Sequence, residues 1–219
     1  SGSKVVVLTP AMAERLMPAL AELVGDDVTF VSVGGEVEGA QNLDALAAEQ
    51  SPDPLPGALE GTDMLYSSGT TGRPKGVLRQ LTGQPLGTSA GLGLLGELLM
   101  GMNTESVYLS PAPMYHAAPL KWSIESLALG ASVVLMERFE PEAVLDAIQT
   151  HRVTHAQFVP TMFVRMLKLP EEVRIGYDVS SLVGVIHAAA PCPPDVKRQM
   201  MDWMGPIINE YYAGTEGSG

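Results

Sequence analysis

Leu65-Tyr66-Ser67-Ser68-Gly69-Thr70-Thr71-Gly72-Arg73-Pro74-Lys75-Gly76-Val77 is the stretch from which the rest of the chain is best interpreted. The apolar run before it, Met64–Tyr66, predicts a strand that leads into a loop rich in hydroxyl groups. Glycines let the backbone approach an anion closely and adopt positive φ. Serine and threonine hydroxyls donate hydrogen bonds to phosphate oxygens, and Lys75 adds a positive charge. The loop therefore predicts a polyphosphate-binding site.

This loop is not a Walker A motif, because that motif requires glycine directly before its lysine and Pro74 precedes Lys75. Residues 65–77 resemble instead, without a gap, the phosphate loop of the adenylate-forming superfamily. That superfamily includes acyl-CoA synthetases, luciferases and the adenylation domains of peptide synthetases. The resemblance implies that the β- and γ-phosphates of ATP are bound here, by Ser67, Ser68, Gly69, Thr70, Thr71, Gly72 and Lys75.

Composition is typical of a folded protein. The chain has 219 residues, of which 46% are apolar and 17% charged, enough for one large domain or part of a larger one. The net charge of −12 argues against nucleic acid and anionic membrane surfaces as partners. It does not argue against ATP, which interacts with local donors.

Cysteine content and hydropathy favour a cytoplasmic location. Cys192 is the single cysteine, so no disulfide framework is possible, which fits a reducing compartment. No apolar run reaches transmembrane length, and no secretory signal opens the chain. Residues 1–3 have the composition of an expression scar, which leaves residues 4–219 for the folded part.

Strand and helix patterns alternate along the chain. Strands are predicted at Lys4–Leu8, Val28–Val33, Met64–Tyr66, Val107–Leu109, Ser132–Met136, Ala156–Val159, Leu182–His187 and Ile207–Tyr212. Helices are predicted at Ala11–Val24, Gly87–Gly101, Pro119–Leu129, Pro141–His151, Thr161–Leu167 and Pro194–Met204. The alternation predicts an α/β fold, with a mostly parallel β-sheet covered by helices on both faces. Ligands of such sheets lie beyond the carboxyl ends of the strands, which is where the loops after Tyr66, Leu109 and Tyr212 are expected.

A second motif follows the strand at Val107–Leu109. The segment Pro111-Ala112-Pro113-Met114-Tyr115-His116 resembles the superfamily's aromatic–histidine pair beside the acyl pocket. The resemblance places His116 near the substrate carboxylate and the α-phosphate, where an imidazole donor would be useful. Taken alone, His116 would more often be a satisfied core histidine than a functional one. Members of the superfamily commonly have a glycine just after this histidine, where the present chain has Ala117, Ala118 and Pro119. The sequence therefore does not define the shape of the acyl pocket.

Two further segments complete the resemblance. His187-Ala188-Ala189-Ala190-Pro191 is similar to the superfamily's Gly-Gly-Ala-Pro segment, which implies that Ala188, Ala189 and Ala190 let adenine lie against the backbone. Asn209–Gly217 resembles its Tyr-Gly-x-Thr-Glu motif, with Ala213 in place of glycine. The resemblance implies that Tyr212 stacks on adenine, that Thr215 donates to the α-phosphate, and that Glu216, together with Thr70, binds Mg²⁺.

The resemblance covers nearly the whole chain and implies a two-step reaction. A carboxylic acid, fatty or otherwise apolar, would be activated with MgATP as acyl-AMP and then passed to coenzyme A, with His116, Thr215 and Glu216 as the catalytic residues. Residues 4–219 would be the central part of the large N-terminal adenylation domain, without the C-terminal lid. Such a piece is expected to have little activity alone and to self-associate, as a homodimer or otherwise, through uncovered apolar surface. An amino-acid adenylation domain and a catalytically silent nucleotide-binding scaffold remain alternatives.

Overall fold

The computed structural model describes residues 2–25, 27–67, 72–88 and 91–214, and the chain divides into two units, residues 1–57 and 58–219. The first unit contains strands β1 (Val5–Leu8), β2 (Thr29–Ser32) and β3 (Gln41–Asn42) and helices α1 (Pro10–Leu23) and α2 (Leu43–Ala48). Its three strands form a parallel sheet in the order β1-β2-β3. Side chains at the helix starts fix both helices, since Thr9 Oγ1 accepts from Met12 N and Asn42 Oδ1 accepts from Ala45 N.

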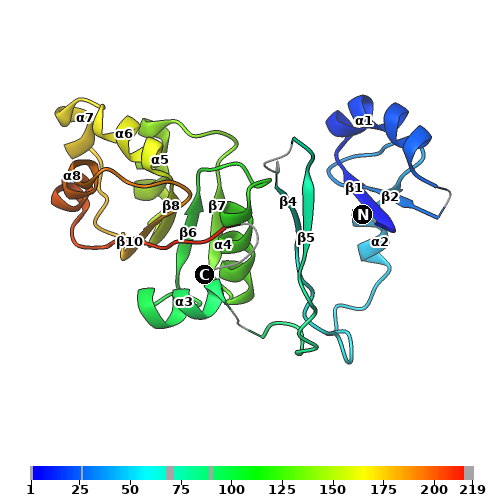
Figure 1. The fold of residues 1–219 in the computed structure, drawn as a ribbon. Coiled ribbons are helices and arrows are strands. Elements are labelled where there is room, and N and C mark those ends of the chain that lie inside the picture. Colours follow the sequence, from blue (N-terminus) through cyan, green and yellow to red (C-terminus); the bar gives the residue numbers. More distant parts are fainter. Residues whose placement is uncertain (1, 26, 68–71, 89–90, 215–219) are drawn as a thin grey trace. The chain divides into compact units, whose positions relative to one another are not determined.

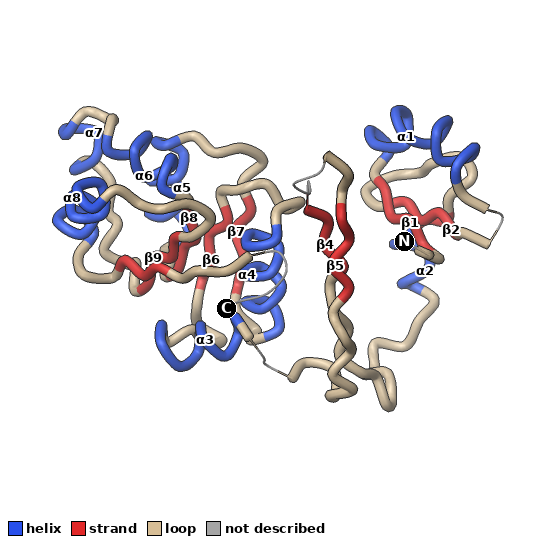
Figure 2. The backbone as a smooth tube through the Cα atoms, in the orientation of Figure 1, coloured by secondary structure: helices blue, strands red, loops and turns tan. Residues whose placement is uncertain are grey.

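The second unit contains a five-stranded sheet and a separate hairpin (Figures 1 and 2). Its strands are β4 (Met64–Ser67), β5 (Lys75–Leu78), β6 (Val107–Ser110), β7 (Ser132–Leu135), β8 (His155–Phe158), β9 (Gly184–His187) and β10 (Ile208–Glu210). Its helices are α3 (Leu92–Met100), α4 (Ala117–Ala128), α5 (Pro141–His151), α6 (Pro160–Leu167), α7 (Glu171–Ile175) and α8 (Pro194–Met204). The five-stranded sheet is parallel throughout, in the order β10-β9-β8-β6-β7.

Helices cover both faces of this sheet, as the sequence predicted. On one face, side chains of α5, α6 and α8 join strand residues in the larger apolar core, which includes Val144, Phe163, Met200 and Phe158. On the other face, Met100 of α3 and Trp122 of α4 pack with Tyr108 and Ile186. Burial on both faces explains why β8 and β9 have no exposed residue.

The predicted helix at residues 87–101 is longer than the helix observed there. Helix α3 begins at Leu92 and ends at Met100, and its buried residues are Gly93, Gly96 and Met100. A Cβ atom at Gly96 would lie 2.8 Å from Met102 Sδ, so the glycine permits a close approach that a side chain would block. Leu94, Leu98 and Leu99 are exposed, so the leucine-rich composition of this helix does not mark a helix that is buried all round.

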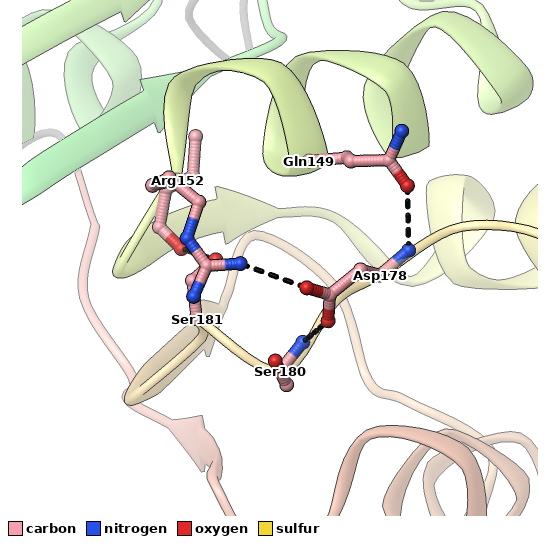
Figure 3. A network of polar contacts seen from close by, with 6 residues as sticks. Gln149, Arg152, Asp178, Ser180 and Ser181 are labelled. Carbon is pink, nitrogen blue, oxygen red and sulfur yellow. Dashed lines mark hydrogen bonds and ion pairs between the residues drawn. The ribbon is translucent and has the colours of Figure 1, made fainter.

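The turn between α7 and β9 is tied to the end of α5 by a polar network (Figure 3). Arg152, which caps α5 in the left-handed conformation with φ 51°, donates from Nη1 to Asp178 Oδ2 at 2.8 Å. Asp178 Oδ1 accepts from Ser180 N, and Asp178 N donates to Gln149 Oε1. Hydrogen bonds from Ser180 and the charge of Arg152 lower the pKa of Asp178. The network joins the end of α5 to the segment that leads into β9, the strand before the predicted Ala188–Ala190 site segment.

Among these described ranges, no helix is long and apolar enough to cross a membrane.

Candidate functional site

Three of the predicted site segments leave the same edge of the five-stranded sheet. Because all five strands are parallel, their carboxyl ends lie together. His116 lies in the connection after β6, Ala188–Ala190 follow β9 directly, and Tyr212 follows β10. Strands β9 and β10 are neighbours, whereas β8 separates β6 from β9. The sheet therefore brings the predicted carboxylate-binding and adenine-binding segments to one edge.

The order of the strands reverses between β6 and β8. The chain passes from β6 to β7 on one side and then returns to place β8 on the other side of β6. The ladder between β6 and β8 consists of two residue pairs, Tyr108 with His155 and Leu109 with Ala156, and it stops before Ser110 and Gln157. Such a reversal is where open α/β sheets bind ligands. The connections after β6 and β8 flank this position.

Gln157 is a polar residue at this position that the sequence analysis did not identify. Its side chain is buried, its Nε2 donates to Phe158 O at 3.2 Å, and its Oε1 has no hydrogen-bond partner within the described ranges. A buried carbonyl oxygen without a donor is costly in a protein interior. A glutamine within an otherwise apolar strand was the available signal.

The segment after β6 presents His116 at the start of α4. His116 is the residue that caps this helix, its side chain makes no capping hydrogen bond, and its ring lies 4.5 Å from the ring of Tyr115. Both side chains are exposed. The amino end of a helix carries a partial positive charge, which favours an anion next to His116. This geometry suits a carboxylate or a phosphate.

The methionine before this pair is held by two serine hydroxyls. Met114 Sδ lies 3.8 Å from Ser110 Oγ and 3.6 Å from Ser123 Oγ, and its side chain is half-buried. Met162 lies in the larger apolar core, and Trp122 is fully buried in the smaller one. Met114 and Tyr115 are therefore the apolar side chains next to His116 in the sequence that are not in either core.

Ala188, Ala189 and Ala190 form the predicted adenine shelf at the end of β9. Ala188 is buried, whereas Ala189 and Ala190 are exposed. Ala189 has a φ of 74°, in the left-handed region that glycine adopts without strain. The shelf therefore keeps the backbone shape of a glycine at a position occupied by alanine.

We expect Ala189→Gly to raise the free energy of unfolding by about 1 kcal/mol, because it removes the steric cost of a Cβ at positive φ. Thermal unfolding of the variant would measure the gain. Ala190→Gly is the matched control, since Ala190 is not among the positive-φ residues and glycine there should destabilise by about 0.5–1 kcal/mol. A loss of stability in Ala189→Gly would contradict the expectation.

The segment after β10 carries two tyrosines in different environments. Tyr211 is partly buried, and its Oη accepts from Trp122 Nε1 at 3.3 Å, with the two rings 6.1 Å apart in an edge arrangement. Tyr212 is 89% exposed, and Ala213 next to it is also exposed. The exposed ring of Tyr212 is accessible, and an aromatic face suits stacking on a purine.

The predicted phosphate loop connects two antiparallel strands, not a strand of the parallel sheet. Within the described residues, strands β4 and β5 form a two-stranded sheet of their own, with Ser67 opposite Lys75 in the last pair before the loop. The expectation that the strand ending at Tyr66 belongs to the parallel sheet is therefore wrong, because β4 pairs with β5 in antiparallel fashion. Residues 68–71 of the loop lie outside the described residues. Ser67 and Lys75 stand opposite each other at the base of the loop, and Gly72 adopts a φ of 78°.

An ion pair joins the chain just before β4 to helix α4. Lys121 Nζ lies 2.8 Å from Asp63 Oδ1, and the two side chains are 25% and 17% exposed. Burial raises the pKa of Asp63, but the hydrogen bond and charge of Lys121 outweigh it, so this pKa lies below its ordinary value. The pair links the hairpin that carries the phosphate loop to the helix that His116 caps.

We expect Asp63→Asn to lower the free energy of unfolding by about 1–3 kcal/mol, because Lys121 loses its charged partner in a partly buried position. Urea titration of the variant would measure the loss. Glu140→Gln is the matched control, since its pair with Arg165 is 3.4 Å long and half-exposed, and should change stability by less than about 0.5 kcal/mol. Equal effects of the two substitutions would refute the role of the pair.

Several predicted site residues lie outside the described part of the chain. They are Ser68, Gly69, Thr70, Thr71, Thr215 and Glu216. Both predicted magnesium ligands, Thr70 and Glu216, are among them. The described residues contain no group of three or more histidine, cysteine, aspartate or glutamate side chains that could hold a metal ion.

The sequence matches the family model of AMP-binding enzymes over residues 1–219. It is 33% identical to 4-coumarate–CoA ligase 1 of Oryza sativa subsp. japonica over 96% of this chain and 38% of that protein. It is also 33% identical to a feruloyl-CoA synthase of Amycolatopsis sp., over 99% of this chain and 40% of the relative. The chain thus spans about two fifths of the length of these relatives.

The fold has solved counterparts. The crystal structure of ATP-bound MatB from Rhodopseudomonas palustris superposes with a TM-score of 0.69 at 26% identity, covering 97% of this chain and 40% of that one. The similarity extends over both units of the chain and agrees with the α/β architecture described above.

Proposed function

The chain belongs to the AMP-binding enzyme family, and from that membership we propose that the protein activates a carboxylic acid with ATP and transfers the acyl group to coenzyme A. In the first step a carboxylate oxygen attacks the α-phosphorus, an acyl-AMP forms and pyrophosphate leaves. In the second step the thiol of coenzyme A attacks the acyl carbon and AMP leaves. The two named relatives are a CoA ligase and a CoA synthase, and these names support coenzyme A as the thiol acceptor.

The observation that carries the proposal is the hydroxyl-rich and glycine-rich loop closed by the Ser67–Lys75 pair. A structural turn does not need four hydroxyls and a lysine, whereas a triphosphate needs several donors and a cation. Catalysis of this kind depends on positioning and charge neutralisation. The loop would supply both to the β- and γ-phosphates.

The remaining roles follow the same chemistry. His116, at the amino end of α4, would donate to the carboxylate or α-phosphate, and Tyr212 would stack on adenine above the shelf. Thr215 would donate to the α-phosphate. Glu216 and Thr70 would hold Mg²⁺, which neutralises phosphate charge when bound.

The acid is proposed to be apolar, because Met114 and Tyr115 are the side chains beside His116. Fatty, aryl and steroid side-chain acids all fit this description. The names of the relatives, 4-coumarate–CoA ligase and feruloyl-CoA synthase, add weight to aryl acids. An amino-acid adenylation domain is the weaker enzyme alternative, since its pocket usually needs an aspartate that we cannot place at this edge.

The test is ATP–pyrophosphate exchange by the protein in its full natural length, against fatty acids, aryl acids such as 4-coumarate and ferulate, steroid side-chain acids and amino acids. Exchange with one class would establish adenylation and identify the substrate, and acid-dependent consumption of coenzyme A would establish the second step. Exchange with amino acids alone would show that the protein is an amino-acid adenylation enzyme. No exchange with any acid, with MgATP binding intact, would favour a nucleotide-binding scaffold.

A further inference from the structure

His187, the last residue of β9, is fully buried, yet neither of its ring nitrogens has a hydrogen-bond partner among the residues that the structure describes. The other buried histidine, His155, differs in this respect. Its Nδ1 lies 2.9 Å from Thr154 Oγ1 and its Nε2 lies 2.9 Å from Met100 O. Buried polar groups in native proteins are normally paired, and the exceptions concentrate at functional sites.

His187 lies next to both of the predicted adenine-binding segments. It directly precedes Ala188–Ala190, and it stands opposite Glu210 in the pairing of β9 with β10. Glu210 in turn directly precedes Tyr211 and Tyr212. Tyr211 N donates to His187 O at 3.3 Å, so the main chains of the two segments are already connected at this point.

The side chain of His187 faces a single charged pair. Glu210 Oε2 lies 3.8 Å from His187 Nε2, and the same oxygen lies 2.9 Å from Lys197 Nζ of α8. On its other sides β8 contributes Phe158, its partner in the sheet, and α6 contributes Phe163, whose ring lies 5.4 Å away in an edge arrangement. Burial lowers the pKa of His187, so near neutral pH the ring is uncharged and carries one N–H. The hydrogen bond from Lys197 lowers the pKa of Glu210, which keeps that carboxylate ionised as an acceptor.

We propose that His187 is a positioning residue that, through Glu210, fixes the shelf at the end of β9 against the Tyr211–Tyr212 segment at the end of β10. The proposal rests on the proposed function, because adenine is what these segments would hold between them. Functional hydrogen bonds are often long before a ligand binds and shorten when it does. The 3.8 Å gap between Nε2 and Oε2 would close to hydrogen-bond distance as the two segments come together on the base. Lys197 holds the carboxylate in place for this contact.

A purely structural role of His187 and a positioning role predict different effects of His187→Phe on ATP binding. Phenylalanine fills nearly the same volume as histidine and leaves no unpaired nitrogen, so His187→Phe should then be neutral or stabilising and without effect on ATP. If His187 positions the shelf, the same variant keeps its stability but binds ATP less well. His187→Gln restores an N–H near the position of Nε2 and should recover most of the loss.

The experiment compares wild type, His187→Phe and His187→Gln, with His151→Gln as the control because His151 is exposed at the end of α5. In the protein of full natural length we expect His187→Phe to raise the KM for MgATP and its dissociation constant about tenfold, with kcat within about twofold and an unchanged melting temperature. His187→Gln should lie within about threefold of wild type, and His151→Gln should equal it.

The outcomes separate this proposal from the proposed function. An active wild type whose His187→Phe variant has an unchanged KM and dissociation constant for MgATP would overturn the role of His187 alone. If wild type shows no exchange with any acid, the proposed function fails, and the dissociation constants still decide the role of His187. A wild type that binds no MgATP would overturn both. Should His187→Phe not fold, Glu210→Ala removes the other member of the pair and must weaken MgATP binding by a similar factor.

Discussion

Truncation of Trp122 to alanine is expected to cost about 3–5 kcal/mol of unfolding free energy, a large fraction of the roughly 5–15 kcal/mol that is typical of a whole domain. Trp122 is fully buried in the smaller core, against Met100, Tyr108 and Ile186. Its Nε1 donates to Tyr211 Oη, so the truncation leaves both a cavity and an unpaired hydroxyl. Denaturant titration of the purified variant would measure the loss.

Two substitutions on the same helix control this experiment. Trp122→Phe keeps most of the volume and removes the N–H, so it should cost less than the alanine variant. Ile124 lies on the opposite face of α4 and is 51% exposed, so Ile124→Ala should change stability by less than about 1 kcal/mol. A Trp122→Ala variant as stable as Ile124→Ala would show that the smaller core does not support the sheet.

Substitution of Glu216 by glutamine is expected to lower ATP–pyrophosphate exchange about 10²–10³-fold, while binding of the acid changes little. The amide keeps the shape of the side chain but removes the charge that a hard cation requires. The prediction comes from the sequence motif, because Glu216 lies outside the described residues. Exchange rates of the variant in the protein of full natural length would test it.

Glu105→Gln is the control for charge alone. Glu105 is exposed just before β6, at the end of the sheet away from the predicted site, and its substitution should leave exchange unchanged. An unaltered rate in Glu216→Gln would remove Glu216 from the predicted machinery. Equal losses in both variants would point to the overall charge and not to a metal ligand.

The elements with strong local signals were predicted closely from the sequence. Helices α5 and α8 have the predicted bounds, because Pro141 and Pro194 start them with a fixed φ and without a needed N–H. Short elements were missed. Helix α7 has five residues, and β5 has four residues, one of them glycine, so neither shows a clear period.

The sequence motifs name His116, Ala188–Ala190 and Tyr212 as site residues, and parallel pairing brings these three segments to one edge of the sheet. Their roles in binding stay predictions. The separation of the β4–β5 hairpin was not predicted, since a run of apolar residues does not reveal its pairing partner. The pairing state of Gln157 and His187 depends on which atoms surround their side chains, and no sequence pattern contains that information.

The short ladder between β6 and β8 has a consequence for how the sheet holds together. The sheet has two halves on either side of this ladder, one made of β6 and β7 and the other of β8, β9 and β10. Strands β6 and β7 share four residue pairs, as do β8 and β9. In the described sheet, the ladder between the halves has two residue pairs, next to the hydrogen bonds of Thr154 with Val107. Local opening follows the boundaries where the fewest backbone bonds must break. Side chains bridge this boundary, because both apolar cores take residues from the two halves, Leu109 with Val185 in the larger core and Tyr108 with Ile186 in the smaller one. The gap in the backbone ladder reaches the carboxyl edge between Ser110 and Gln157, beside the connections after β6 and β8. Opening of the sheet at this boundary would therefore have to break apolar packing as well as backbone hydrogen bonds.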